Sequence, residues 1–320
     1  MKALVGPNSF GLERVIADLA PIHSQVQFAH CASRDDLIQA IADAEIYLGW
    51  LNRQEFLAAR LLRWIQSPSS GVDRFLAIPE LRQGDVLLTS ARGTHGACVA
   101  EHALAMILAF TRGIRASVIQ QQNRRWAIRE LRPTTVELTG STMGIIGFGA
   151  IGRALAKRAS TFDVRVFAVD VMPAEKPDYV ARLDDLSGLD ALLQESDYVV
   201  VTAPYTEETR GLLNAKRLAR LKPSAILVGV SRGGIIDEGA LAQALRDHRL
   251  AGAALDVCAT EPLPEDSPLW NMEHLLITPH IAGGSQLESQ IILEIFTDNL
   301  GRFLRGEFPL RNQVDKTRGF

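Results

Sequence analysis

The strongest constraint on the fold is a glycine motif that lies between an apolar run and a helix-forming run. Residues 143–156 read Met-Gly-Ile-Ile-Gly-Phe-Gly-Ala-Ile-Gly-Arg-Ala-Leu-Ala, which contains the spacing G-x-G-x-x-G. In such a motif Gly147 allows a tight turn, Gly149 lets the backbone approach a pyrophosphate, and Gly152 lets the helix pack closely on the strand. The motif predicts a dinucleotide-binding unit. A P-loop is excluded, because Arg-Ala follows Gly152 where a P-loop requires Lys and then Ser or Thr.

An acidic residue marks the end of the next predicted strand. Asp170 closes the apolar run 165–170. A carboxylate at this place accepts hydrogen bonds from the ribose hydroxyls of an adenosine and repels a 2′-phosphate. We therefore expect NAD as the cofactor, with NADH preferred over NADPH, although the nearby Lys176 would weaken that preference.

Short Val- and Ile-rich runs alternate with longer amphipathic runs along almost the whole chain. This alternation predicts an α/β protein built from parallel sheets, and a length of 320 residues favours two domains. The predicted strands are 3–5, 26–28, 46–48, 64–65 and 86–89 in a first series, and 143–146, 165–170, 198–202, 225–230, 251–256 and 275–278 in a second. A long helix from Ala97 to about Gln121, interrupted only by Gly113, is expected to connect the two series.

Composition excludes several classes of protein. With 47% hydrophobic and 22% charged residues the chain resembles ordinary globular proteins, and a net charge of −3 gives no reason to expect a nucleic-acid or membrane partner. Three scattered cysteines form neither a disulfide framework nor a metal site, so we expect a reducing, cytoplasmic compartment and no metal. No apolar run approaches the length of a membrane span, which predicts a soluble protein. The basic and aromatic cluster at 124–126 is interpreted as an interdomain or interface element.

The residues with chemical potential follow strands of the second series, whose carboxyl ends share one edge of a parallel sheet. Arg232 lies between an apolar strand and two glycines, where its guanidinium could bind a carboxylate with two hydrogen bonds. His280 ends the last predicted strand, and Glu261 lies in a proline-stiffened loop within reach of it. A carboxylate beside an imidazole fixes its tautomer and favours its protonated form, which suits a proton donor.

One alternative comes from the same segment. Residues 229–233 also match G-x-S-x-G, and Ser231, Asp256 and His280 follow the chain order of an α/β-hydrolase triad. In that fold a helix begins directly after the serine, whereas here the first helix-start signal is at Asp237. The hydrolase interpretation also leaves the glycine motif unexplained.

With these residues in place, the sequence resembles the D-isomer-specific 2-hydroxyacid dehydrogenase family over nearly its whole length. The shared motifs are Gly71-Val-Asp73, Ala100-Glu-His102, the glycine motif 147–152, Pro204-x-Thr-x-x-Thr-Arg-Gly211, Ser231-Arg-Gly233, Ala254-Leu-Asp-Val257 and Pro279-His280. The resemblance implies a flavodoxin-like substrate domain, residues 1–97 plus 285–320, and an NAD-binding Rossmann domain, residues 98–284, with a cleft between them. It also implies a homodimer and a final helix that returns to the first domain.

The resemblance also implies roles for individual residues. Arg232 would bind the substrate carboxylate and carbonyl, His280 would be the acid/base, Glu261 its partner, and Asp256 a contact of the nicotinamide carboxamide. Backbone N–H groups of Ser70 and Gly71 would bind the substrate carboxylate. The expected cofactor-binding set is Thr94, Gly147, Gly149, Ala150, Ile151, Gly152, Asp170, Thr202, Pro204, Thr209, Val230, Ser231, Asp256, His280 and Gly283.

These observations lead to one principal hypothesis, reversible hydride transfer between NAD(H) and a small 2-oxo or D-2-hydroxy acid. Two departures from the family pattern bear on the choice of substrate: Ser70 replaces the usual Ala before Gly-Val-Asp, and Tyr205 replaces the usual Leu after Pro204. A second hypothesis is an NADH-sensing, corepressor-like binding protein of the same fold, which would keep these residues and act by interaction.

Overall fold

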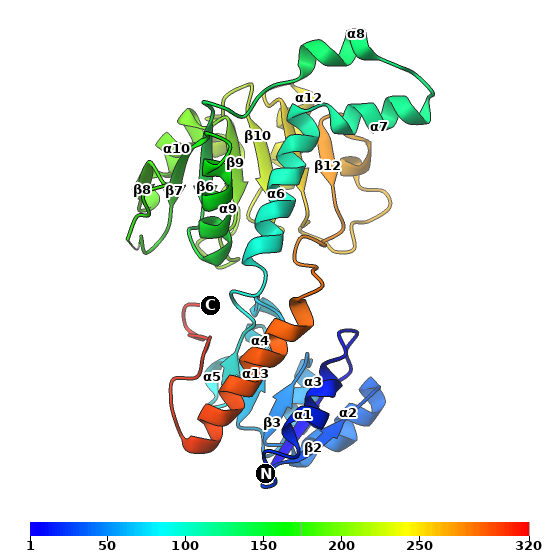
Figure 1. Ribbon diagram of the computed structural model, residues 1–320, viewed down its shortest axis with the longest axis vertical. Coiled ribbons are helices and arrows are strands. Elements are labelled where there is room, and N and C mark those ends of the chain that lie inside the picture. Colours follow the sequence, from blue (N-terminus) through cyan, green and yellow to red (C-terminus); the bar gives the residue numbers. More distant parts are fainter. Residues whose placement is uncertain (174, 320) are drawn as a thin grey trace. The chain divides into compact units, whose positions relative to one another are not determined.

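The computed structural model describes residues 1–173 and 175–319 and divides into two compact units (Figure 1). Unit 1 comprises Met1–His95 and the chain from Ser285 onward, and unit 2 comprises Gly96–Gly284. The boundaries implied by the family resemblance, 97/98 and 284/285, compare with 95/96 and 284/285 in the structure.

Unit 1 is built on a five-stranded parallel sheet with the order β2-β1-β3-β4-β5, which is the flavodoxin-like order. Its strands are β1 (Lys2–Val5), β2 (Gln27–His30), β3 (Ile46–Leu48), β4 (Trp64–Gln66) and β5 (Leu87–Thr89). Its helices are α1 (Val15–Leu19), α2 (Arg34–Ala40), α3 (Arg53–Ala58), α4 (Asp73–Leu76), α5 (Pro79–Gln83) and α13 (Glu288–Arg305), with short 3₁₀ turns at Leu12–Arg14 and Ile41–Asp43.

Successive residues of the unit 1 strands enter two different cores, because side chains alternate across a sheet. Ile46 and Leu48 pack with α1 and the apolar face of α13, whereas Tyr47 between them packs with α2, α4 and α5. The predicted strands of this unit are each present to within about two residues, and the helix expected to open at Arg34 begins there.

Unit 2 is built on a seven-stranded parallel sheet with the order β12-β11-β10-β9-β6-β7-β8. If β6 is counted as strand 1 and the sheet is followed from β8 to β12, the order becomes 3-2-1-4-5-6-7. The first six positions are the strand order of a dinucleotide-binding sheet, and β12 is one added strand. The strands are β6 (Thr142–Ile146), β7 (Arg165–Val169), β8 (Arg182–Asp184), β9 (Tyr198–Val201), β10 (Ile226–Gly229), β11 (Gly252–Leu255) and β12 (Leu275–Ile277). The predicted class, two α/β units with parallel sheets, is confirmed. The sequence interpretation missed β8, a three-residue edge strand with two charged residues.

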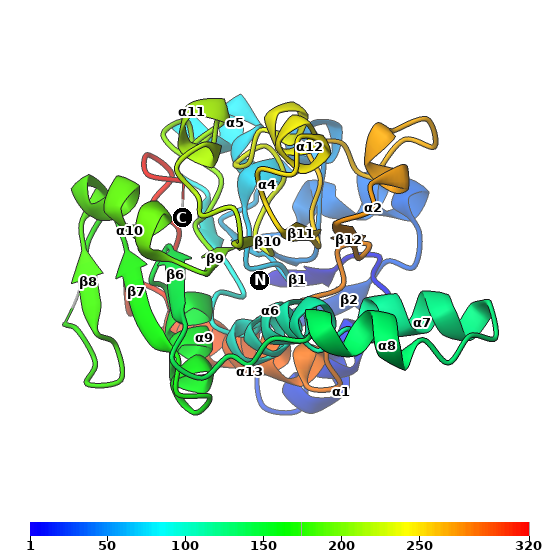
Figure 2. The same cartoon turned by 90° about the horizontal axis from the view of Figure 1, so that it is seen from above.

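Helices cover both faces of the unit 2 sheet (Figure 2). One face carries α6 (Gly96–Thr111) and α9 (Ala150–Ser160), and the other carries α10 (Leu189–Glu195), α11 (Ala215–Leu218) and α12 (Glu238–Arg246). Ile145 packs on the α6 and α9 side, and the next residue, Ile146, packs on the opposite side. The remaining elements are α7 (Ile114–Gln122), α8 (Ile128–Leu131) and 3₁₀ turns at Arg132–Thr134, Leu186–Gly188 and Pro268–Asn271.

The long helix predicted from Ala97 is two helices that meet at an angle of 64°. Gly113 lies at the break with a φ of 64°, a left-handed conformation that glycine adopts without strain. In the part of the chain that the structure describes, no single helix is long and apolar enough to cross a membrane, and only the bent pair α6 and α7 meets that criterion jointly.

Candidate active site

The glycine motif forms the turn between β6 and α9. Gly147 has a φ of 95°, and a Cβ placed on it would lie 2.6 Å from the backbone nitrogen of Ala203. A Cβ on Gly152 would lie 2.3 Å from the Gly147 carbonyl oxygen, so both positions require glycine for the fold itself. A Cβ on Gly149 would have no described heavy atom within 4 Å. Gly149 is therefore the position where the loop leaves room for a group from outside the chain, as pyrophosphate binding demands.

Asp170 lies just beyond β7 and is fixed against the glycine loop. Its carboxylate accepts hydrogen bonds from the backbone N–H groups of Phe148, at 2.6 Å, and Met172, at 2.9 Å. Since Phe148 is the residue between Gly147 and Gly149, the acidic side chain and the phosphate loop are held together as one unit. The residues of this edge therefore fit the adenosine half of a dinucleotide.

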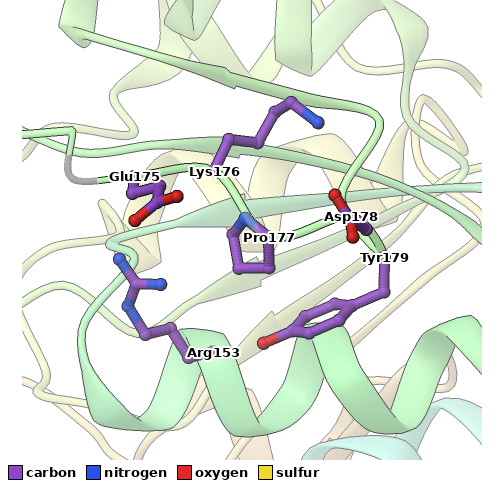
Figure 3. Close-up of a pocket in the computed structure, with 6 residues that line it drawn as sticks. All are labelled: Arg153, Glu175, Lys176, Pro177, Asp178 and Tyr179. Atoms are coloured by element: carbon purple, nitrogen blue, oxygen red, sulfur yellow. The ribbon is translucent and has the colours of Figure 1, made fainter.

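A hollow of about 520 Å³ lies beside this edge, lined by Arg153 and residues 175–179 (Figure 3). The Arg153 guanidinium lies 4.7 Å from the centre of the Phe148 ring. The Lys176 side chain points away from Arg153, and its ammonium donates to the Val180 carbonyl oxygen at 2.8 Å. Both cations line the hollow, and the Lys176 ammonium is engaged by its own loop.

The other residues expected at the cofactor follow neighbouring strands of the same sheet. Thr202, after β9, donates to the Gly147 carbonyl oxygen at 2.6 Å, and Thr209 donates to the Pro204 carbonyl oxygen at 2.7 Å. Unit 2 holds all of the expected cofactor-binding residues except Thr94, which lies in unit 1. The hydroxyl of Thr94 donates to the carbonyl oxygen of Ala91.

His280 and Glu261 are directly paired. His280 Nδ1 lies 2.7 Å from one oxygen of the Glu261 carboxylate, and the other oxygen accepts from the backbone N–H of Cys258 at 3.0 Å. The His280 side chain keeps 43% of its surface exposed and that of Glu261 keeps 29%. The outer nitrogen of His280, Nε2, is therefore the atom available to exchange a proton with a bound molecule.

Asp256 supports the turn that carries His280. Its buried carboxylate accepts from the Thr278 hydroxyl at 2.6 Å and from the backbone N–H groups of Ile281 and Ala282, each at 3.0 Å. His102 on α6 completes this network, with Nε2 2.9 Å from the Thr278 hydroxyl. The sequence does not predict Thr278 as a supporting residue, and His102 is predicted only as part of a family motif, because the contact between them spans 176 positions of the chain. The expected contact of Asp256 with the nicotinamide stays a prediction.

Arg232 lies on the loop after β10 and is half-buried. One of its guanidinium nitrogens donates to the Ser231 carbonyl oxygen at 2.8 Å. A Cβ on the next residue, Gly233, would lie 2.0 Å from the backbone of Cys258, so the loops bearing Arg232 and Glu261 are in backbone contact. The fold of unit 2 thereby brings Arg232, Glu261 and His280 to the same edge of the sheet.

The α/β-hydrolase alternative is wrong in its geometry. His280 pairs with Glu261 and not with Asp256, whose carboxylate is engaged by the 278–282 turn. The helix after Ser231 begins only at Glu238, so Ser231 does not occupy a nucleophile elbow. The buried Ser231 hydroxyl has no hydrogen-bond partner among the described residues.

Two groups next to Glu261 have shifted proton affinities. Burial, together with the carboxylates of Glu238, Glu261 and Asp256, raises the pKa of Cys258 to about 11. Burial also raises the pKa of Glu238 above its usual value, and the charge of Glu261 adds to this shift. Cys258 is therefore a neutral thiol near pH 7 and not a nucleophile.

The expected substrate residues Ser70 and Gly71 lie in unit 1, on the loop after β4. The backbone N–H groups of Ser70, Gly71 and Val72 donate to no acceptor within the described part of the chain. Three consecutive N–H groups without protein acceptors can receive an anion such as a carboxylate.

Comparisons with known proteins agree with this geometry. The family model "D-isomer specific 2-hydroxyacid dehydrogenase, NAD binding domain" matches residues 104–282. A glyoxylate reductase of Thermofilum pendens is 36% identical over 285 residues, which is 87% of this chain and 83% of that protein.

Two solved structures share the fold over the whole chain. A D-isomer specific 2-hydroxyacid dehydrogenase family protein from Aeromonas salmonicida has a TM-score of 0.87 and 31% identity, covering 98% of this chain and 99% of that one. An NADPH-dependent glyoxylate/hydroxypyruvate reductase from Sinorhizobium meliloti, in complex with NADP and sulfate, has a TM-score of 0.86 and 27% identity, covering 100% of both chains.

Proposed function

Because the chain belongs to the D-isomer-specific 2-hydroxyacid dehydrogenase family, we propose that it interconverts a small 2-oxo acid and its D-2-hydroxy acid with NADH as the preferred reductant. Hydride transfer between a nicotinamide nucleotide and an acid of this class is the activity of the family. The observation that carries the assignment of roles is the 2.7 Å contact between His280 and Glu261.

The chain's own residues supply binding and proton transfer. Arg232 binds the substrate carboxylate and polarises the carbonyl at C2, together with N–H groups of Ser70 and Gly71. His280 donates a proton from Nε2 to the C2 oxygen during reduction and takes it back during oxidation. Glu261 fixes the His280 ring through Nδ1, which leaves Nε2 as the working nitrogen. When bound, the nicotinamide supplies or accepts the hydride.

The preference for NADH rests on Asp170. Its carboxylate is fixed by two backbone N–H groups at the place where a ribose would bind, and a 2′-phosphate would meet its negative charge. The Lys176 ammonium donates to the Val180 carbonyl oxygen and its side chain points away from Arg153 (Figure 3), so we expect it to contribute little to a 2′-phosphate contact. Arg153, which also lines the hollow, is the second cation that could contact a 2′-phosphate.

The experiment is an initial-rate panel of NADH and NADPH against glyoxylate, hydroxypyruvate, pyruvate and 2-oxoglutarate. We expect turnover with NADH, and a loss of about 10²-fold or more in kcat for His280→Ala. Asp170→Asn should move the ratio of kcat/KM for NADPH over NADH up by about tenfold, because the charge is lost, although the amide oxygen can keep only one of the two backbone hydrogen bonds. Lys176→Met is the matched control and should leave that ratio unchanged. Equal use of both cofactors by the unaltered enzyme would refute the NADH preference.

We also propose that the protein is a homodimer that uses α7, α8 and their flanks. The exposed apolar side chains of this region are Ile114, Val118, Ile119, Trp126, Ile128 and Val136. Trp126 is 93% exposed, and none of the α7 residues is buried. Both views show α7 and α8 projecting from the rest of unit 2. A second copy of the chain would cover this apolar surface.

Sedimentation tests the dimer. We expect Trp126→Asp to convert a dimer to a monomer, and Leu186→Asp, an exposed apolar position elsewhere on unit 2, to leave the dimer intact. A monomeric unaltered protein would overturn the assignment. The three free cysteines fit a cytoplasmic location, which fractionation of cells expressing the protein would test.

A further inference from the structure

Unit 1 contains three side chains joined in series by two polar contacts, and none of them belongs to the His280–Glu261 pair. The Ser70 hydroxyl oxygen lies 2.7 Å from His95 Nδ1, and His95 Nε2 lies 2.9 Å from a carboxylate oxygen of Glu288. The three residues come from the loop after β4, the loop after β5 and the first turn of α13. The side chains of His95 and Glu288 are only 13% and 17% exposed, so the contact is not a loose surface pair.

The hydrogen of the Ser70 hydroxyl has two possible acceptors, and both belong to the protein. Besides His95 Nδ1, the Ser70 oxygen lies 3.0 Å from the carbonyl oxygen of Ala91, which can only accept. If the hydrogen goes to Ala91, His95 must donate to the Ser70 oxygen, and if it goes to His95, Ala91 receives none. As long as its hydrogen stays with one of these two acceptors, the hydroxyl offers only lone pairs to a further partner.

Ser70 also stands where the substrate is expected. Its backbone N–H begins the run of three N–H groups that lack an acceptor in the described part of the chain, and the proposed function assigns the first two of them to the substrate carboxylate. A molecule bound to this N–H comes close to the hydroxyl of the same residue. Since C1 is the carboxylate and C2 carries the reacting carbonyl, C3 is the first atom at which substrates of this class differ.

We propose that Ser70 is a specificity-determining residue that accepts a hydrogen bond from a neutral hydroxyl group at C3 of the substrate. The same lone pairs repel an anionic group at C3, such as a phosphonooxy or carboxylate group, whose oxygens are also acceptors. His95 and Glu288 are positioning residues that hold the Ser70 hydroxyl in this orientation. The proposal rests on the proposed function and narrows its substrate class to 2-oxo acids with a small or hydroxylated C3.

The competing explanation is that the three side chains only stabilise the loop. A structural role would change KM for all substrates alike, whereas a role in specificity changes the ratio between substrates that differ by one hydroxyl group. Hydroxypyruvate and pyruvate are such a pair, and glyoxylate has no C3 at all.

The experiment measures kcat and KM for hydroxypyruvate, pyruvate, glyoxylate and 3-phosphonooxypyruvate with NADH. For the unaltered enzyme we expect kcat/KM to be about 3- to 10-fold higher for hydroxypyruvate than for pyruvate, the value of one added hydrogen bond, and to be lowest for phosphonooxypyruvate. Ser70→Ala should bring the first ratio close to one by raising KM for hydroxypyruvate more than KM for pyruvate. Ser70→Thr keeps the hydroxyl and should retain the ratio.

His95→Phe and Glu288→Gln should reduce the same ratio in part, with KM affected and kcat preserved. Ser69→Ala, on the same loop, is the matched control and should leave the ratio unchanged. If Ser70→Ala lowers activity on all substrates equally, or if phosphonooxypyruvate is preferred, this inference is overturned while the proposed function stands. If no 2-oxo acid is turned over, both are overturned.

Discussion

The glycine loop has two properties, room for a ligand at Gly149 and close packing of the chain at Gly152. Replacing each glycine in turn by alanine, which adds one methyl group, tests the two properties separately. At Gly149 an added Cβ meets no described atom, and the backbone angles φ −76° and ψ −155° are open to alanine. At Gly152 an added Cβ lies 2.3 Å from the Gly147 carbonyl oxygen, which is part of the backbone and cannot rotate away. The same substitution should therefore have opposite effects at two positions of one motif.

The magnitudes follow from these contacts. For Gly152→Ala, relieving the clash requires a shift of about 1 Å, and such overpacking costs about 3 kcal/mol at the upper end of its usual range. The better helix propensity of alanine returns about 1 kcal/mol, which leaves a net loss of about 2 kcal/mol. For a unit of this size that lowers Tm by about 4–8 °C. For Gly149→Ala the loss of a good N-cap residue and the gain in chain stiffness nearly cancel, so Tm should change by less than about 3 °C.

The assay pairs thermal unfolding of the unliganded protein with NADH binding measured by calorimetry. Gly149→Ala should keep the Tm of the parent and weaken NADH binding by about tenfold or more, because the methyl group occupies the space left for the pyrophosphate. Gly152→Ala should lower Tm before any cofactor is added. If Gly149→Ala binds NADH as tightly as the parent, the space beside Gly149 is not the phosphate site. If it unfolds as early as Gly152→Ala, our interpretation of the contacts is mistaken.

Three further predictions concern the loops around the acid/base pair. Glu261→Gln should lower kcat by about 10- to 30-fold, the value of one charge-assisted hydrogen bond to His280; an unchanged kcat would contradict the pairing. Cys258, with a pKa of about 11, should be a thiolate in only about one molecule per thousand at pH 8. Iodoacetamide should therefore label Cys258 in the unfolded chain and not in the folded one, which peptide mass spectrometry would measure. Gly233→Ala should separate the Arg232 loop from Cys258 and reduce kcat/KM even where circular dichroism shows an intact fold; full activity would exclude the need for that contact.

Local sequence signals were sufficient for much of the unit 2 site. The glycine motif, Asp170 and the residues after each strand are short-range features, and in a parallel sheet the carboxyl ends of the strands share one edge. Once the strands were placed to within about two residues, the position of Arg232, Glu261 and His280 on that edge followed. The sequence also predicts that Glu261 lies within reach of His280, and in the structure the two side chains are 2.7 Å apart.

The supporting contacts could not be obtained in this way, because they join residues that are far apart in the chain. His102 meets Thr278 across 176 positions, and His95 meets Glu288 across 193. A lone histidine on a helix is more often a packing residue than part of a site, so its sequence context gives no signal for its partner. The edge strand β8 was missed for a different reason: three residues with charged ends carry no apolar pattern.

The backbone at His280 explains why these distant contacts matter to the chemistry. His280 has a φ of 55°, a left-handed conformation that is uncommon for a residue with a side chain and persists only where neighbours enforce it. The enforcement comes from Asp256: its carbonyl oxygen accepts the His280 N–H at 2.8 Å, and its carboxylate holds the next two N–H groups. Thr278 and His102 in turn fix that carboxylate. The direction of the His280 ring, and with it the reach of Nε2, is therefore set by a buried acid that need not touch the substrate.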